Sequence, residues 1–466
     1  MSELSRAGVA DIVRRTTERD LTARVVVDEV LARIAETDPP LNAFSNVLAD
    51  EARAEASARD ASLAAGETPG PLHGVPIAIK EEIDVAGAVT TFGGDANSSP
   101  AKEDAEIVRR LRAAGAVIVG KTTMPEFGAF PFTESVSRGI TRNPWDPSRT
   151  PGGSSGGTAV AVSSGMVPVG IGGDGGGSIR IPSASCGLFG LKPQRGRVTT
   201  APHPHLWWAL GTAGPLARTV LDSALVYDVI RGNVDGDLYR AGDAPSFAEA
   251  ARVDPPRLRI GWSVKPAIRG IKPDPVHVRA VEETARLLAD LGHDVREIDP
   301  KYPDATTAFV PQFFAGIRSE ADQVEHYDRL ERRIRETYRL GSWVRPRVVE
   351  WALKQTEKVS VKANRVFDSI DVLLTPTIAN RPPKVGRLDG VGTVGASLRA
   401  QPSIAYAALW NVAGNPAAAV PCGIAEDGLP VSIQLVGRTD DEATLFSLSA
   451  QIEKARPWPL LAGDAS

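Results

Sequence analysis

The 466-residue chain contains only two cysteines, Cys186 and Cys422. A single pair so far apart in the sequence argues against the disulfide framework of a small secreted domain. Neither cysteine has histidines at the spacing of a zinc site, so we expect no metal ion. This cysteine usage predicts a cytoplasmic protein, since the cytoplasm keeps thiols reduced.

The chain also lacks a long hydrophobic run and an excess of charge of one sign. No apolar run approaches the roughly 18–20 residues that span a bilayer. Residues 1–20 alternate in charge and show no apolar signal-peptide core. The 53 basic and 57 acidic side chains leave a formal net charge of −4, which favours neither nucleic acid nor a membrane as a partner.

Apolar spacing predicts helices that alternate with short buried strands, which indicates an α/β fold. Because there is no internal repeat, low-complexity segment or clear linker, we expect one domain over residues 1–466. It divides into an N-terminal helical region (about 1–65), a core (about 70–215) and a charged helical outer layer or lid (about 300–370). Asp104 is expected to cap a helix that ends at Gly115. Further helices are predicted over 22–37, 48–64, 158–164, 219–230, 275–291 and 441–455, and strands over 75–80, 116–119, 167–171, 258–262, 295–298, 371–376 and 430–436.

Two glycine-rich turns each contain a serine, and the serines lie 24 positions apart. Ser154 belongs to the turn at 151–157, and Ser178 to the turn at 172–182. Dense glycine leaves backbone N–H groups uncovered and allows positive φ, so the main chain can wrap around a small polar atom. Two such turns, joined by an apolar segment, indicate a site.

Three short motifs match known patterns without the structural context that those patterns need. Residues 115–122 match a phosphate-binding loop, but their central residues are those of a strand. Residues 170–175 match a dinucleotide-binding turn, but Pro182 is expected to stop the next helix early. Residues 152–156 match the nucleophile elbow of α/β-hydrolases, although no strand precedes them. An esterase that uses Ser154 is therefore only a remote alternative.

A wider set of motifs resembles the amidase signature family over nearly the whole chain. Lys80 closes the predicted strand 75–80, and Ser154 and Ser178 lie in the two turns. The resemblance implies a single large α/β domain whose central mixed, twisted sheet is covered by helices on both faces. It also implies hydrolysis of a carboxylic amide without a cofactor. The other matching segments are 120–127, 141–147, 186–193, 411–416 and 428–437.

The resemblance assigns Ser178 as the nucleophile, Ser154, in a cis peptide, as the proton relay, and Lys80 as the base. These roles agree with the chemistry, because a serine hydroxyl needs a neighbouring base to become nucleophilic. Burial can lower the pKa of a lysine from about 10.4 toward 7–8, where it can act as that base. The oxyanion is expected to bind the backbone N–H groups of Gly175, Gly176, Gly177 and Ser178.

Departures from the family pattern bear on the substrate. Gly175 stands where a hydroxyl-bearing or branched residue is usual, which is expected to widen the pocket. The segment 203–210 replaces a run that is typical of the amidotransferase subunit that uses glutamine. A stand-alone amidase is therefore favoured over an amidotransferase-type subunit that supplies ammonia in a complex. The same acyl-enzyme route would also admit esters, anilides and carbamates.

The sequence allows two interpretations for each of two groups of residues. Asp174 and Arg180 flank the nucleophile as a structural pair, with contact between Arg180 and an anionic substrate as the alternative. A set of aromatic residues fits equally well in the hydrophobic core and in a pocket wall that selects aryl or hydrophobic amides. The aromatic residues are Phe127, Phe130, Phe132, Trp207 and Trp208.

The expected partner is a small-molecule amide. The sequence leaves open whether the chain assembles as a homodimer.

Overall fold

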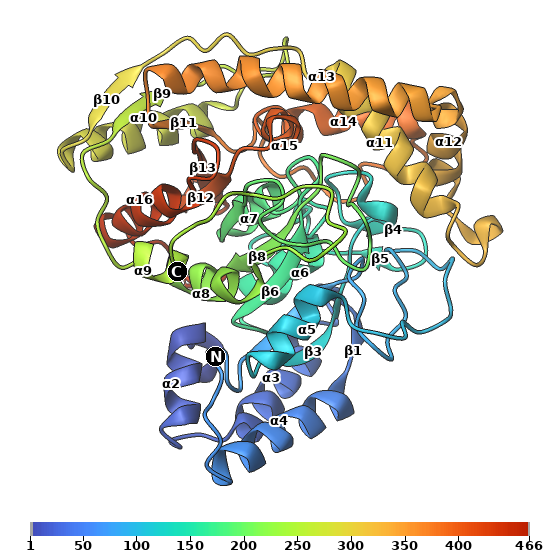
Figure 1. Ribbon diagram of the computed structural model, residues 1–466, viewed down its shortest axis with the longest axis vertical. Helices are drawn as coiled ribbons and strands as arrows, with labels where there is room; N and C mark the ends of the chain where they lie inside the picture. Colours follow the sequence, from blue (N-terminus) through green and yellow to red (C-terminus); the bar gives the residue numbers. More distant parts are fainter. Residues whose placement is uncertain (1–2, 465–466) are drawn as a thin grey trace.

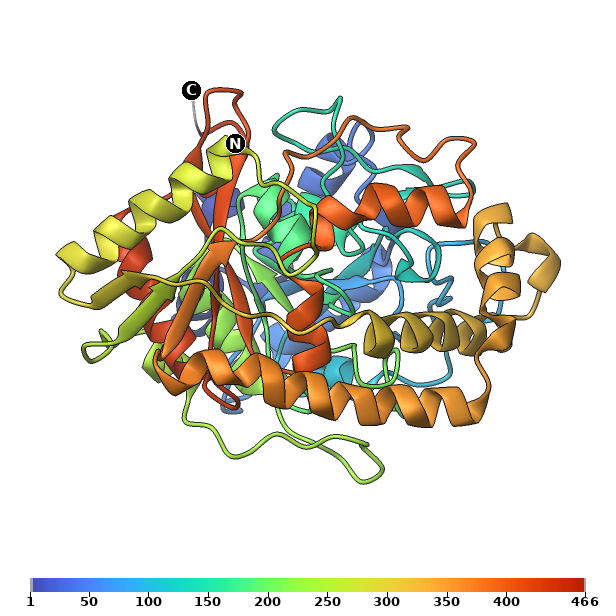
Figure 2. The same ribbon diagram turned by 90° about the horizontal axis from the view of Figure 1, so that it is seen from above.

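Eleven strands form one mixed sheet, and helices cover both of its faces (Figures 1 and 2). The computed structural model describes residues 3–464. The strand order is β1-β3-β2-β6-β8-β7-β12-β13-β11-β9-β10. The pairs β2–β3, β2–β6, β9–β10 and β9–β11 are parallel, and the other pairs are antiparallel. The predicted α/β domain with a central mixed sheet is confirmed.

The elements alternate along the chain as the sequence predicts. The strands of the large sheet are β1 (Phe44–Val47), β2 (Pro76–Lys80), β3 (Val117–Thr122), β6 (Val169–Gly173), β7 (Phe189–Lys192), β8 (Ala213–Ala217), β9 (Arg259–Trp262), β10 (Asp294–Glu297), β11 (Val372–Pro376), β12 (Ala417–Ile424) and β13 (Pro430–Val436), and β4 (Glu134–Ser135) and β5 (Gly139–Ile140) form a separate ribbon. The α-helices are α1 (Glu3–Arg6), α2 (Val9–Thr17), α3 (Ala23–Thr37), α4 (Ala49–Ala64), α5 (Glu106–Ala113), α6 (Gly156–Ser163), α7 (Arg180–Cys186), α8 (Val220–Ile230), α9 (Phe247–Ala250), α10 (Pro275–Asp290), α11 (Thr306–Ala321), α12 (Arg332–Leu340), α13 (Pro346–Asn364), α14 (Thr393–Ile404), α15 (Ala408–Ala413) and α16 (Glu442–Ala455). Short 3-10 turns are η1 (Glu126–Gly128), η2 (Tyr327–Arg329), η3 (Gly341–Trp343) and η4 (Arg365–Asp368).

Strand β2 shows how the sheet separates two hydrophobic cores. Ile77 and Ile79 pack into the core that contains α5, α8, α10 and α16. Ala78 packs into the core that contains α3, α4 and α6. Because successive side chains of a strand point to opposite faces, Lys80 lies on the same face as Ala78. The strand therefore directs its terminal lysine toward α6.

Helix α6 packs unusually close to β6 because glycine alternates along that strand. A Cβ atom on Gly170 would lie 2.6 Å from the Thr158 side chain, and one on Gly172 would lie 2.7 Å from Ser155 Oγ. Val169 and Ile171 fill the opposite core. The strand thus brings the start of α6, with the turn that carries Ser154, onto the sheet.

The sequence patterns miss β1, β7, β8 and β12. Strands β8 and β12 are rich in alanine, glycine and proline, which have low strand propensity. Both lie in the middle of the sheet, where every residue of β8 is buried. Pro421 is accommodated beside a register shift in the β12–β13 ladder. Tertiary pairing overrides the local preference of these segments.

Two expectations about helix ends are wrong. Pro182 does not stop a helix early, because it is the third residue of α7, where a missing N–H breaks no hydrogen bond within the helix. The helix ends instead at Gly187, which has a left-handed φ of 74°. Asp104 does not cap α5, whose first turn follows Ala105. Asp104 forms an ion pair with Arg112 at 3.0 Å.

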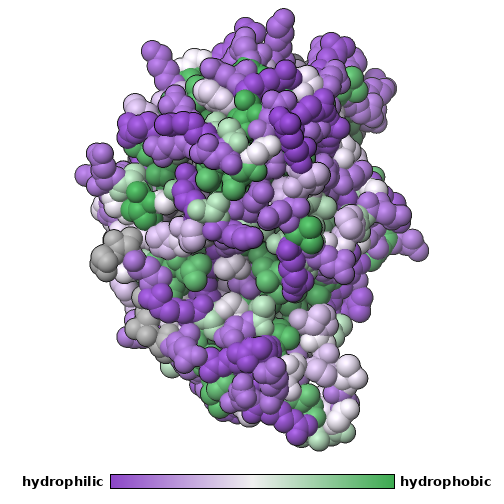
Figure 3. Space-filling model, turned by 90° about the vertical axis from the view of Figure 1, so that its left-hand side faces the viewer, coloured by the Kyte–Doolittle hydropathy of each residue, from purple (hydrophilic) through white to green (hydrophobic). Residues whose placement is uncertain are grey.

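The surface carries no continuous apolar layer on the face drawn in Figure 3, where hydrophobic residues occur in small groups among hydrophilic ones. Such mixed exposure is ordinary for a folded chain. Among residues 3–464, none of the helices has the length and apolar character of a membrane span.

Glu126 joins the segment after β3 to helix α12. Its Oε2 atom accepts a hydrogen bond of 2.8 Å from the backbone N–H of Glu331, which immediately precedes α12. Its carboxylate packs against Gly94, where a Cβ atom would lie 2.2 Å from Oε1. Burial, together with the charge of Glu331, raises the pKa of Glu126 to about 8.

The substitution Glu126→Gln should weaken the pH dependence of stability. Between the ordinary pKa of 4.5 and about 8, the folded chain holds a proton that the unfolded chain has released. The free energy of unfolding of the wild-type protein therefore falls as the pH rises through this window, and glutamine removes that contribution. Urea unfolding at several pH values measures the slope, with the exposed Glu51→Gln as a control. Equal slopes in the wild type and Glu126→Gln would contradict the prediction.

Candidate active site

Lys80 and Ser154 are in contact although 74 positions separate them. Lys80 is the last residue of β2, and Ser154 lies in the turn before α6. The Lys80 Nζ atom lies 2.8 Å from Ser154 Oγ. The two residues are 1% and 2% exposed, and the Gly153–Ser154 peptide bond is cis. The lysine is thus excluded from water with the serine hydroxyl as a direct partner.

Ser178 lines the same hollow as Lys80 and Ser154. Its carbonyl oxygen accepts a hydrogen bond of 3.3 Å from the backbone N–H of Ser155, so the two glycine turns are joined directly. Ser178 is half-buried and therefore more accessible than Ser154. Gly128 closes the hollow beside Ser154, where a Cβ atom would lie 3.0 Å from Ser154 Oγ. The three side chains predicted for catalysis are brought together in one place.

Glu82 is a second partner of Lys80 for which the sequence predicts no role. Its Oε1 atom lies 3.0 Å from Lys80 Nζ, and its side chain is 11% exposed. The carboxylate lies against the backbone of Gly173, where a Cβ atom would come within 2.1 Å of Oε1. Glu82 thus provides a counter-charge for the buried lysine. Its position two residues after Lys80 is the only signal in the sequence that points to it.

Ser154 and Ser155 have different surroundings despite their adjacency. Ser155 Oγ exchanges hydrogen bonds of 3.2 Å with the backbone of Gly173. Of these two hydroxyl groups, only that of Ser154 forms a hydrogen bond with Lys80 among the residues that the structure describes. The contact with Lys80 therefore singles out Ser154, as does its 24-residue spacing from Ser178.

The glycine turn of Ser178 is held by a fully buried ion pair between Asp174 and Arg180. The Arg180 Nε atom lies 3.0 Å from Asp174 Oδ2, and neither side chain is exposed. All five guanidinium hydrogens have acceptors, since the group also contacts Asn411, Gln434 and the carbonyl oxygen of Ala407. The structural interpretation of the pair is supported, because Arg180 has no donor left for an anionic substrate.

Asp174 also orders the turn by accepting hydrogen bonds from backbone N–H groups of the turn. Although burial raises its pKa, the Arg180 guanidinium and the hydrogen bonds from Arg180 and Asn411 hold the pKa of Asp174 below its usual range. The carboxylate accepts hydrogen bonds from the N–H groups of Gly177 at 2.7 Å and Ile179 at 3.2 Å. The N–H of Gly177 is therefore already occupied.

The other N–H groups of this turn are free to bind a ligand. Among residues 3–464, the backbone N–H groups of Gly175, Gly176 and Ser178 donate no hydrogen bond. Gly175 lines the hollow together with Ser178. The expected set of oxyanion donors therefore narrows to these three.

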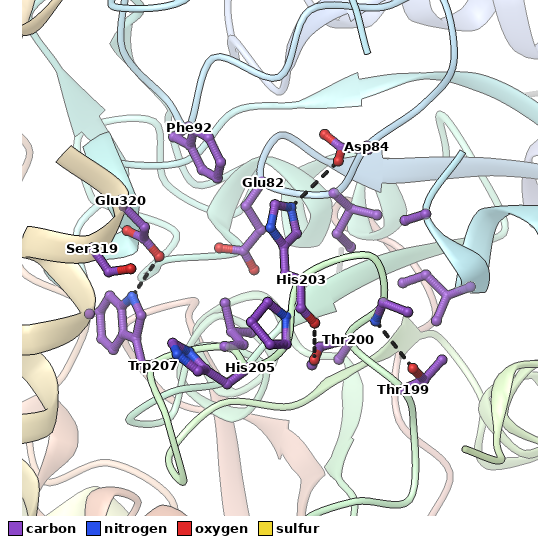
Figure 4. Close-up of a pocket in the computed structure, with 18 of the residues that line it drawn as sticks. Glu82, Asp84, Phe92, Thr199, Thr200, His203, His205, Trp207, Ser319 and Glu320 are labelled. Carbon is purple, nitrogen blue, oxygen red and sulfur yellow. Dashed lines mark hydrogen bonds and ion pairs between the residues drawn. The ribbon is translucent and has the colours of Figure 1, made fainter. Parts of the chain in front are cut away.

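A larger cavity of about 130 Å³ lies beside the hollow and shares Glu82, Leu206 and Trp207 with it (Figure 4). Of the five aromatic residues considered as a pocket wall, only Trp207 lines this cavity. Trp208 stacks on His205 with ring centroids 4.2 Å apart. The remaining three, Phe127, Phe130 and Phe132, belong to the hydrophobic core.

Gly175 does not widen the pocket as expected. A Cβ atom on Gly175 would lie 3.0 Å from the Trp207 ring, so the indole occupies the space beside the glycine. Phe92, which the sequence does not single out, supplies the other aromatic side of the cavity.

The described residues, 3–464, contain no cluster of histidine, cysteine, aspartate and glutamate that could hold a metal ion. Cys186 and Cys422 are free thiols, and burial raises the pKa of each above its ordinary value. Cys186 is a core thiol, whereas Cys422 is only partly buried against the core. A raised pKa lowers the reactivity of both, since the nucleophilic form of cysteine is the thiolate.

A model of the Amidase family matches residues 25–446 of the chain. The chain belongs to the amidase family. A Mycobacterium tuberculosis protein named "Putative amidase AmiB2" is 47% identical over 460 residues, which cover 98% of both proteins. A glutamyl-tRNA(Gln) amidotransferase subunit of Chloroflexus aurantiacus is 35% identical over 488 residues, again with 98% of each protein covered.

Among solved structures, that of 6-aminohexanoate cyclic dimer hydrolase matches with a TM-score of 0.92 and 29% sequence identity, and the match covers 98% of each chain. The family and this structural neighbour identify the protein as an amide-hydrolysing enzyme. The single α/β domain is therefore an amidase fold.

In this amidase, the substitution Arg180→Met should lower the free energy of unfolding by about 3–5 kcal/mol, because it leaves the buried Asp174 carboxylate without its counter-charge. Denaturant unfolding measures the loss. Lys265→Met is the matched control, since Lys265 forms an exposed ion pair with Asp299 and should lose no more than about 1 kcal/mol. Similar losses for both variants would contradict the assignment of the Asp174–Arg180 pair as a structural centre.

Proposed function

We propose that this amidase hydrolyses amides through an acyl-enzyme on Ser178, with Ser154 as the proton relay and Lys80 as the base. The observation that carries the proposal is the 2.8 Å contact between Lys80 Nζ and Ser154 Oγ in the hollow that Ser178 lines. A serine becomes nucleophilic when a base takes its proton, and this arrangement provides the base through one intermediate hydroxyl.

The reaction begins with attack of Ser178 Oγ on the amide carbonyl carbon. The Ser178 proton passes to Ser154 Oγ while Ser154 gives its own proton to the Lys80 side-chain nitrogen, which acts as the base. The tetrahedral intermediate collapses, the C–N bond breaks, and the proton returns from Lys80 through Ser154 to the leaving nitrogen. A water molecule then attacks the ester along the same proton route and releases the carboxylate.

The oxyanion of the tetrahedral intermediate binds the free N–H groups of Gly175, Gly176 and Ser178. A single donor of this kind typically contributes about 3 kcal/mol to transition-state stabilisation. The Asp174–Arg180 pair acts on the same turn as a positioning pair, because Asp174 binds the N–H groups of Gly177 and Ile179. These donors are therefore oriented before the substrate arrives.

An amidotransferase-type subunit is the second candidate function, because the Chloroflexus aurantiacus relative is a subunit of that kind. Such a subunit supplies ammonia within a complex, and it predicts weak activity of the isolated chain and co-purification of a partner. Full activity of the purified chain on simple amides, without a partner, favours the stand-alone enzyme. Activity measured on a panel of amides, anilides, esters and carbamates shows which acyl compounds either enzyme accepts as substrates.

Three further features stay predictions. They are the cytoplasmic location, assembly as a homodimer, and a lid role for the helical region of about 300–370. The last has one supporting observation, since α11 contributes Gly316, Ser319 and Glu320 to the wall of the cavity. Size-exclusion chromatography with light scattering measures the oligomeric state.

Ser178→Ala and Lys80→Met should each lower kcat by at least about 10⁴-fold, as expected for members of one catalytic unit. Ser164→Ala is the control: among the described residues, the Oγ atom of Ser164, at the end of α6, bonds only the carbonyl of Val160. A serine-directed fluorophosphonate should label Ser178, and peptide mass spectrometry identifies the labelled residue. Wild-type turnover of Ser178→Ala, or labelling at Ser154, contradicts the mechanism.

Ser154→Ala and Ser155→Ala separate the relay from its neighbour. Loss of the Ser154 hydroxyl breaks the proton route to Lys80, so kcat should fall by several orders of magnitude. Loss of the Ser155 hydroxyl removes only its hydrogen bonds to Gly173, which should lower kcat by no more than about tenfold. Steady-state kinetics with an anilide measures both, and a larger loss for Ser155→Ala refutes the assignment.

A further inference from the structure

The hollow around Lys80, Ser154 and Ser178 is too small to hold a substrate. Its volume of about 10 Å³ is close to the minimum of about 10–15 Å³ that one water molecule needs. The adjoining cavity of about 130 Å³ is an order of magnitude larger, and cavities of about 150 Å³ can hold a benzene-sized ligand. The part of the substrate next to the scissile bond therefore has its room in this cavity.

Trp207 forms the partition between the hollow and the cavity, because it lines both. Its indole ring is seated between two glycines, since a Cβ atom would come within 3.0 Å of the ring from Gly175 and within 2.7 Å from Gly316. The Trp207 Nε1 atom donates a hydrogen bond of 2.9 Å to Glu320 Oε1. The Trp207 ring and the Glu320 carboxyl group are therefore fixed relative to the turn that carries Ser178.

Glu320 brings a carboxyl group to the cavity, and the charge of Lys80 offsets only part of the rise in its pKa. Glu82 also lines the cavity, but it is paired with Lys80. Within residues 3–464, Glu320 forms no ion pair, and its buried Oε2 atom accepts no hydrogen bond. Burial, followed by the nearby charge of Glu82, raises the pKa of Glu320 well above its ordinary value. The ionised form of Glu320 is destabilised by these surroundings, and a bound cation would stabilise it.

The rest of the cavity suits an aliphatic chain. Figure 4 shows the Glu320 and Glu82 carboxyl groups on the side of the cavity where Phe92 and Trp207 also lie. The only other acidic residue of the lining, Asp84, is paired with His203 at 3.4 Å. Apolar side chains such as Ile107 and Leu206 cover much of the remaining wall. An aromatic side next to a carboxylate is a favourable setting for an ammonium group.

We propose that this cavity binds an alkylammonium group of the substrate, whose nitrogen donates to Glu320 Oε2 while its carbon chain lies along the apolar wall. The preferred substrate is then an aliphatic amide that carries a protonated primary amine on one side of the scissile bond. The proposal rests on the proposed function, because the cavity is placed by its contact with the hollow of Ser178.

Matched substrates test the proposal on the wild-type enzyme. An ω-aminoalkanoyl p-nitroanilide is compared with the n-alkanoyl p-nitroanilide of equal length, and mono-amides of a diamine are compared with those of the matching alkylamine. The amino-bearing member of one pair should be preferred by about tenfold to a hundredfold in kcat/KM, as expected for a hydrogen bond between charged groups. Equal kcat/KM values within both pairs would overturn the proposal.

Glu320→Gln keeps the shape of the side chain and an acceptor for Trp207 but cannot carry charge. It should remove most of the preference, through a rise in KM for the amino-bearing substrate relative to KM for the neutral one. Asp322→Asn is the matched control, because it removes an exposed carboxylate just beyond the end of α11. A preference that survives Glu320→Gln, or that Asp322→Asn removes equally, contradicts the role of Glu320.

Binding to the inactive enzyme separates this proposal from the mechanism. Calorimetry on the Ser178→Ala variant should show n-pentylamine binding more tightly than n-pentanol, and Glu320→Gln in that background should abolish the difference. Equal binding of amine and alcohol refutes the cavity assignment even if Ser178→Ala is inactive. Wild-type turnover by Ser178→Ala would refute the mechanism and leave this binding result unaffected.

Discussion

The buried pair of Asp174 and Arg180 is the interaction on which the site depends. Asp174 follows β6 and Arg180 begins α7, so the pair closes the turn that presents Ser178. Through Asn411 in α15 and Gln434 in β13, the same guanidinium binds the C-terminal part of the chain. Two charges without access to water are stable only when their hydrogen-bonding capacity is filled, and here every guanidinium donor has an acceptor. The turn therefore has little freedom to change its shape.

A second constraint is the close approach of backbone segments at glycine. Gly170 and Gly172 let the start of α6 reach the sheet, which brings Ser154 to Lys80. Gly173 makes room for the Glu82 carboxylate, and Gly175 and Gly316 make room for the Trp207 indole. In each case, a methyl group would overlap a side chain of the site or its wall. Glycine thus makes room both for the side chains of the proton route and for the wall of the cavity.

In the proposed mechanism, the small hollow contains the reacting groups and the larger cavity binds another part of the substrate. Lys80, Ser154 and Ser178 surround a space of about one water molecule, so the reacting atoms have few alternative positions. Apart from Glu82, Leu206 and Trp207, which line both spaces, the residues of the cavity take no part in the proposed catalytic steps. Changes in those residues can alter the substrate preference without disturbing the proton route. One fold can support many related activities in this way.

Much of the fold followed from sequence, because apolar periodicity marks the long helices and the buried strands β2, β3 and β11 directly. The family motifs also placed Lys80, Ser154 and Ser178 as candidates, since spacing and residue type survive without coordinates. The strands β8 and β12 were not predictable, because their alanines, glycines and prolines are strands only through pairing inside the sheet.

The tertiary structure decided what distant side chains do once they meet. The sequence shows Glu82 beside Lys80 in the chain, but only folding shows that its carboxylate reaches the lysine nitrogen. Glu320 lies 240 positions after Lys80 in a helix without a motif. The sequence by itself was enough to propose the reacting groups, because few residue types can act as a nucleophile or as a base. The filled space beside Gly175 and the place of the Glu320 carboxyl group at the cavity were decided by the fold, because both depend on segments far apart in the chain.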